Sequence, residues 1–208
     1  MKRRADASLV PFMQISDDLV NGSGLCNRLN QPGATGEPIV LEVIRRILSG
    51  QGRSPLPAML NESHRSKCLT GCYHCLHRYG NQTYHGLLDW RLGSSVLQLL
   101  LDGGHTAGLD GDFTAPGVAD WPDVARQLAG EAAGFLSTSA TSCGHIPLLP
   151  RGHGKWAAVI HPLWDWNAVL ASNPDLEALQ QKSEGILPVT TFELSRRMGD
   201  VLHRLKSS

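Results

Sequence analysis

The sequence predicts a fold of the α/β or α+β class, with a small mixed sheet and flanking helices. Apolar residues recur at helical spacing in several segments, and a few short runs between them have the apolar and β-branched content of strands. Helices interleaved with strands in one chain are typical of this class. With 208 residues, of which 41% are hydrophobic and 18% charged, the chain can bury a core without disulfides.

The first half of the chain contains one predicted strand and two predicted helices. Residues 9–15 have strand-like content before the sequence turns polar. Pro38 stands where a first helical residue is expected, and apolar residues follow at helical spacing up to Leu48. A second apolar stripe runs from Leu88 to Leu100 and stops before two glycines, which predicts a second helix.

The second half alternates between helices and strands. Apolar positions from Val124 to Phe135 predict a helix, which a Ser/Thr-rich stretch at 137–142 ends. The other predicted elements are a buried strand at 156–160, short helices at 163–170 and 174–181, a strand at 188–194 and a helix at 195–205.

The best candidate for a domain boundary is the glycine- and aspartate-rich stretch at 103–120, which lacks periodicity. We therefore divide the chain into a metal-binding domain at 9–104, a linker or long loop at 105–120, and a C-terminal α/β extension at 121–208. The first domain is called metal-binding because it contains a cluster of three cysteines.

Charge and hydropathy exclude several classes of protein. Lys+Arg and Asp+Glu both number 19, so the formal net charge is zero and no overall field draws the chain to nucleic acid or membrane. Any nucleic-acid contact has to be local. No run approaches the roughly 18 apolar residues of a membrane helix, and the first residues make a poor secretory signal. We expect a cytoplasmic protein.

Three of the five cysteines form the cluster Cys68-x3-Cys72-x2-Cys75, with Gly71 providing a turn. A turn of this kind can place three sulfurs around one Zn²⁺ ion, and clustered thiols in a reducing compartment favour a metal over disulfides. We therefore predict a zinc knuckle between two helices. Three or four thiolates make a closed shell, and no nearby acid has a His-x-Glu arrangement, so the predicted role of the metal is structural.

The fourth ligand has several candidates. Cys26 is the first choice, because it offers another thiolate just after a glycine-rich turn, and Cys143 is the second. The alternatives are histidines 64, 74, 77 and 85, of which His74 is badly placed between two ligands.

Two other interpretations of the cysteines stay open. They can be ordinary reduced thiols that pack as small apolar residues. Alternatively, Cys72 and Cys75 can form the dithiol of a thiol-disulfide oxidoreductase. The redox interpretation is weaker, because Cys68 crowds the pair and no thioredoxin-like βαβ pattern surrounds it.

Several runs resemble a known family. They are DDLVNGSGLC at 17–26, GCYHCL at 71–76, YGNQ at 79–82 and HGLLDWRL at 85–92. Over residues 12–102 the chain resembles the MrfA-type zinc-binding domain, which lies C-terminal to superfamily 2 helicase motors and also occurs in DISARM phage-defence proteins of the DrmB type. Leu25 departs from the pattern, since many relatives carry an aromatic residue there.

The resemblance implies a zinc-stabilised accessory domain that works beside a DNA helicase motor, in DNA repair or antiviral defence. It also implies that Cys68, Cys72, Cys75 and Cys26 are the ligands. The chain has no nucleotide-binding loop of its own, because the nearest match, at 152–156, lacks the required spacing and the hydroxyl for magnesium. We therefore expect a non-enzymatic subunit, a remnant, or the C-terminal part of a helicase.

Nucleic-acid contacts are expected around the knuckle. The candidates for phosphate and base contact are Arg65, Lys67, Arg78, Tyr79 and Arg91, with further tyrosines interleaved. Alternatively, the tyrosines pack against helices and the charges are simply solvated, in which case the domain is a zinc-stabilised protein-interaction module without DNA binding. Asn81 is expected to tie the loop to backbone.

Overall fold

A computed structural model describes residues 2–3, 9–10, 15, 22 and 24–207. Its helices are α1 (Leu25–Leu29), α2 (Ile39–Leu48), α3 (Leu56–Leu60), α4 (Glu62–Arg65), the 3-10 helix η1 (Tyr79–Leu87), α5 (Trp90–Leu101), α6 (Trp121–Phe135), α7 (Trp166–Ser172), α8 (Pro174–Lys182) and α9 (Thr191–Ser207). Its strands are β1 (Lys2–Arg3), β2 (Leu9–Val10), β3 (Thr141–Cys143), β4 (Ile146–Pro150), β5 (Trp156–Ile160) and β6 (Ile186–Thr190). The predicted mixed class is confirmed.

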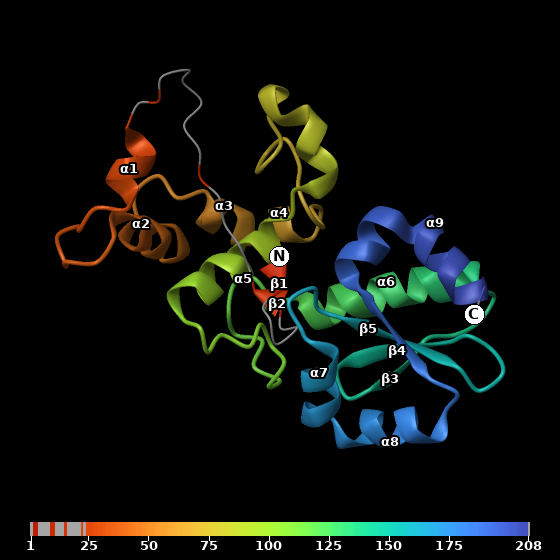
Figure 1. The fold of residues 1–208 in the computed structure, drawn as a ribbon. Helices are drawn as coiled ribbons and strands as arrows, with labels where there is room; N and C mark the ends of the chain where they lie inside the picture. The colour runs from red at the N-terminus through yellow and green to blue at the C-terminus, as the bar shows by residue number, and fades with distance from the viewer. Residues whose placement is uncertain (1, 4–8, 11–14, 16–21, 23, 208) are drawn as a thin grey trace.

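The C-terminal half is built on a four-stranded mixed sheet with the strand order β3-β4-β5-β6. The first three strands are antiparallel neighbours, and β6 pairs parallel to β5 after the chain passes through α7 and α8. Figure 1 shows the sheet between α6 and α9 on one side and α8 on the other. Because helices cover both faces, β4 and β5 are buried along most of their length and show no alternation of apolar and polar residues.

The N-terminal half is a group of short helices around a small core. Pro38 precedes α2, which packs against α5, and the Asp89 carboxylate caps α5 by accepting a hydrogen bond from the Leu92 amide at 3.0 Å. Its buried cluster consists of Met59, Cys68, Cys75 and Trp90. This core is much smaller than that of the α/β half, which draws on the sheet and its helices.

Most predicted helices are present, and the strand predictions are less accurate. The strand predicted at 188–194 lies at Ile186–Thr190, and α9 already begins at Thr191. The β3–β4 hairpin was not predicted at all. It is short, and proline at 147 and 150 hides the strand pattern of β4. Of the strand predicted at 9–15, only β2 and residue 15 lie within the described residues.

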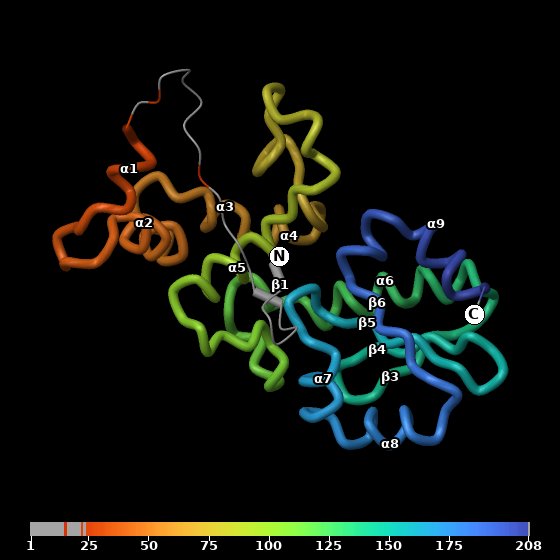
Figure 2. Tube along the Cα trace, viewed as in Figure 1, coloured from red at the N-terminus to blue at the C-terminus, as the bar shows by residue number. Residues whose placement is uncertain are grey.

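The segment 105–120 contains no helix or strand, although it is folded against its neighbours. Ala107 and Val118 are buried in the core of the α/β half. The indole nitrogen of Trp164 donates to the Ala107 carbonyl at 3.1 Å, and the Trp164 and Trp121 rings lie 4.5 Å apart. The chain between α5 and α6 is therefore a packed loop (Figure 2).

Gly117 brings this loop into close contact with α5. A Cβ atom at Gly117 would lie 2.5 Å from the Ser95 hydroxyl oxygen and 2.7 Å from the Arg91 carbonyl oxygen. No side chain fits at this distance, so glycine is needed for the backbone to approach the helix.

Among the described residues, no helix has both the length and the apolar character to cross a bilayer.

We predict that Gly117→Ala destabilises the fold by about 1–3 kcal/mol, because the new methyl group overpacks the contact with α5. Chemical denaturation followed by circular dichroism measures this. Gly103→Ala is the matched control, since a Cβ atom there meets nothing within 4 Å. Equal stability of the two variants would contradict the proposed close approach.

Candidate metal centre

Four side chains of the N-terminal half converge on one point. His64 lies in α4, Cys68 follows that helix, and Cys72 and Cys75 lie in the turn before η1. Their donor atoms are all within 4.8 Å of one another, so the group can hold a metal ion. The Cys68 amide donates to the His64 carbonyl at 2.9 Å, which brings the first thiol round beside the histidine.

The sulfurs are close together without being bonded. The Sγ atoms of Cys68 and Cys75 are 3.8 Å apart, and those of Cys72 and Cys75 are 3.7 Å apart. A disulfide needs about 2.05 Å, and all three cysteines are free. The Cys72 backbone amide donates to Cys75 Sγ at 3.2 Å, which fixes this sulfur within the turn.

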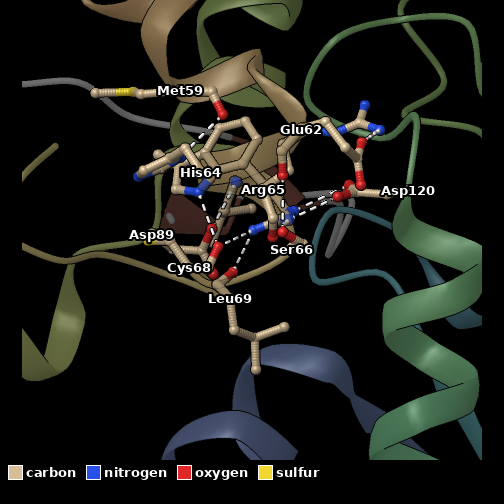
Figure 3. Close-up of polar contacts among 12 residues, drawn as sticks. Met59, Glu62, His64, Arg65, Ser66, Cys68, Leu69, Asp89 and Asp120 are labelled. Atoms are coloured by element: carbon tan, nitrogen blue, oxygen red, sulfur yellow. Dashed lines mark hydrogen bonds and ion pairs between the residues drawn. The ribbon is translucent and has the colours of Figure 1, made fainter. Parts of the chain in front are cut away.

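His64 is held so that one ring nitrogen faces the sulfurs. Its Nδ1 atom is 2.9 Å from the Met59 carbonyl oxygen (Figure 3), and its Nε2 atom is 3.5 Å from Cys72 Sγ. A carbonyl can only accept, so Nδ1 carries a proton, and Nε2 is the ring nitrogen that faces Cys72 Sγ. A histidine that binds a metal through one ring nitrogen usually donates from the other ring nitrogen to a carbonyl or carboxylate oxygen in this way. The Trp90 ring lies 6.0 Å from the imidazole and covers it.

The surroundings affect the thiols unequally. Burial raises the pKa of Cys68 to about 12, and neighbouring thiols add to this effect. For Cys72 burial acts in the same direction, but hydrogen bonds from the His74 backbone and His64 outweigh it and lower the pKa to about 7. Three thiolates this close repel one another, so a bound cation is needed to hold them all deprotonated.

The fourth member of the group is His64 and not Cys26, our first choice. Cys26 lies in α1, where its thiol is 3.6 Å from the Ile15 carbonyl oxygen. Cys143 lies in the α/β half, 3.4 Å from the side-chain oxygen of Asn173. The spacing His64-x3-Cys68 was the signal in the sequence. A four-residue separation around the end of a helix turns two side chains toward the same point.

One arginine connects this centre to the rest of the molecule. Arg91 Nη1 donates to the carbonyl oxygens of Cys68 and Leu69 at 2.7 and 2.6 Å, and its Nη2 atom is 3.3 Å from the Arg65 carbonyl. The same guanidinium makes two hydrogen bonds to Asp120, at 2.9 and 2.6 Å. Against the effect of burial, the hydrogen bond from Arg91 lowers the pKa of Asp120.

The predicted nucleic-acid contacts therefore need a correction at Arg91. Its side chain is buried and fully engaged, so it has no surface to offer a phosphate. Lys67, Arg78 and Tyr79 are exposed, whereas Arg65 is half-buried and pairs with Glu62 at 2.9 Å. Sequence reasoning could not find the burial of Arg91, because its acidic partner is 29 residues away.

The loop after the cysteines is held as expected by Asn81. The side-chain nitrogen of Asn81 donates to the Leu76 carbonyl at 3.0 Å, and its oxygen accepts from the Arg78 amide at 2.7 Å. His85 adds a contact from Nε2 to the same oxygen at 2.9 Å and stacks on His77 with ring centres 3.9 Å apart. The loop is thus internally cross-linked.

We predict that Asp120→Asn destabilises the protein by about 3 kcal/mol, because it leaves the buried Arg91 charge without its counter-ion. Thermal and chemical unfolding measure this change. The matched control is Asp123→Asn in the exposed Asp123–Arg126 pair, where a loss below about 1 kcal/mol is expected. Similar losses in both variants would show that Arg91 has no special structural role.

Comparisons with known proteins supply no relative from which a function could be transferred. No family model matches the chain, and no curated protein or solved structure is significantly similar to it. The functional argument therefore depends on the chemistry of the four donor groups and their surroundings.

Proposed function

We propose that the chain is a zinc-binding, non-catalytic accessory module of a DNA helicase or of a complex that contains one, in DNA repair or antiviral defence. The observation that carries the proposal is the group of His64, Cys68, Cys72 and Cys75.

The donor set and its spacing favour zinc. Zn–S bonds of about 2.3 Å and Zn–N bonds of about 2.0 Å in a tetrahedron place two sulfurs about 3.8 Å apart and a sulfur and a nitrogen about 3.5 Å apart. The sulfurs here are 3.7 and 3.8 Å apart, and Cys72 Sγ is 3.5 Å from His64 Nε2. Three thiolates and one imidazole are a common ligand set of structural zinc sites.

The site favours a structural role for the metal. Four protein ligands complete a tetrahedral shell and leave no position for a reactive water. Within the described part of the chain, the group contains no carboxylate that could serve as a base. Cys68 and Cys75 are buried, which excludes solvent from one side of the centre. The metal would thus lock the turn between α4 and η1, and the chain's own residues would position it.

The helicase partner rests on the resemblance of residues 12–102 to the MrfA-type zinc-binding domain. The ligand group falls within the segment that carries this resemblance. A module of this kind acts by presenting a surface to its motor and to DNA, and its own chain needs no nucleotide-binding loop. The proposed localisation is cytoplasmic, with no membrane partner.

The thiol-disulfide oxidoreductase is the second candidate. It is favoured by the pKa of about 7 at Cys72 and by its 3.7 Å separation from Cys75. His64 and Cys68 argue against it. They lie beside Cys72 and Cys75 and complete a set of four metal donors, and a dithiol that reacts by redox chemistry does not need such a set. A metal measurement separates the two candidates.

We predict one zinc per chain in protein purified without added metal, measured by elemental analysis. Cys72→Ser and His64→Ala lose the metal and lower the melting temperature, because the site then has three ligands and a smaller folding contribution from the metal. Cys26→Ser keeps one zinc and is the matched control.

Two results would contradict this prediction. Wild-type protein without metal, with reversible formation of a Cys72–Cys75 disulfide, would favour the oxidoreductase. Loss of zinc in Cys26→Ser with retention in His64→Ala would reject His64 as the ligand.

The helicase partner has its own test. We predict that the tagged full-length chain, expressed at its natural level in its own cells, co-purifies with a protein that mass spectrometry identifies by its motifs as a superfamily 2 motor. The zinc-site variant Cys72→Ser loses this motor, while Cys26→Ser retains it. Zinc-loaded protein with no motor bound would overturn the helicase assignment and favour a zinc-stabilised module for another partner.

A further inference from the structure

All three tyrosines of the chain lie in one segment, residues 73–87, which we call the aromatic arm. Tyr73, Tyr79 and Tyr84 are 64%, 87% and 59% exposed. Trp90 and Trp121, by contrast, are almost completely buried. Among the described residues, none of the three tyrosine hydroxyls has a hydrogen-bond partner. Hydrogen bonding within the described residues therefore does not explain the positions of these rings.

The arm is held in a fixed shape although its rings are exposed. Asn81 cross-links it to backbone, and the stacked His77 and His85 rings support Tyr73, whose ring meets them edge-on at 5.6 and 5.4 Å. Figures 1 and 2 show the arm projecting above α4, away from the sheet. A fixed ring loses little conformational freedom when a flat group stacks on it.

The stretch of sequence that contains the arm carries charge of one sign. From residue 63 to residue 88 the sequence contains no Asp or Glu, although the whole chain has 19. Arg65, Lys67 and Arg78 fall in the same stretch, and the last two are exposed. A neutral protein thus has a local surface that suits an anion, and exposed aromatic rings suit flat bases.

We propose that the aromatic arm binds single-stranded DNA, with bases stacked on Tyr79 and Tyr84 and phosphates near Arg78 and Lys67. This proposal rests on the proposed function and names the DNA form that the module would hold. Exposed rings combined with cations are typical of single-strand binding, where every base has a face to stack. In a duplex the base faces are covered, so the tyrosines would contribute little.

The test uses the zinc-loaded full-length chain and a fluorescein-labelled dT20 oligonucleotide, with binding followed by fluorescence anisotropy at low salt. We expect saturable binding that is weaker for a 20-base-pair duplex. Tyr79→Ala and Tyr84→Ala should each weaken binding by about tenfold, within the range found for stacking residues. Arg78→Ala should reduce the magnitude of the salt slope by about 0.7, the value for one phosphate contact on a single strand.

The controls separate stacking from misfolding. Tyr79→Phe keeps the ring and should bind as wild type, and so should Phe135→Ala, which removes an exposed ring from α6. Zinc content verifies the fold of each variant. Absence of dT20 binding, equal binding of Tyr79→Ala and Tyr84→Ala to wild type, or tighter binding of duplex would each overturn the proposal. None of these results would affect the zinc or motor measurements, so the two proposals fail separately.

Discussion

The contact between Arg91 and the backbone around Cys68 is the interaction on which the arrangement of the two halves depends. Its guanidinium satisfies carbonyls of the turn that carries the ligands, and it faces Asp120 at the start of α6. A buried guanidinium needs both a counter-ion and hydrogen-bond acceptors, and neither half supplies the complete set. The two halves therefore fix each other. Arg196 of α9 adds a second link by donating to the Leu88 carbonyl at the end of the aromatic arm.

The difference in core size gives a physical reason for a group of possible metal ligands in the N-terminal half. The α/β half has a sheet with helices on both sides and can fold on hydrophobic burial. In the N-terminal half, the buried cluster beside the loop consists of Met59, Trp90 and two of the thiols, which is a much smaller apolar core than that of the α/β half. An ion bound by the four donor groups would replace a core at this point, because its binding energy becomes folding energy when the site forms only in the folded chain.

The sequence predicted what depends on local pattern and missed what depends on distant partners. The apolar spacing located α2, α5 and α6, and the cysteine spacing located the metal group. From the sequence, Cys26 was preferred to His64 as the fourth ligand because a thiolate was ranked above an imidazole. In the structure, the turn at the end of α4 brings His64, and not Cys26, beside the three cysteines. The burial of Arg91 was not predictable, because it depends on Asp120, which a long loop brings back. The close approach of Gly117 to α5 was not predictable for the same reason, because it also depends on residues that are distant in the sequence.

The position of the aromatic arm between these fixed points has a physical consequence. Cys75 holds its beginning at the metal group, and the capped start of α5 and the Arg196 contact hold its end. A segment anchored at both ends loses less entropy on binding than a free loop. Exposed rings carry a cost in water, and rigid anchoring does not remove it. The arrangement is understandable if the rings are covered when the protein works, and an anion with flat faces would suit both the rings and the exposed Lys67 and Arg78.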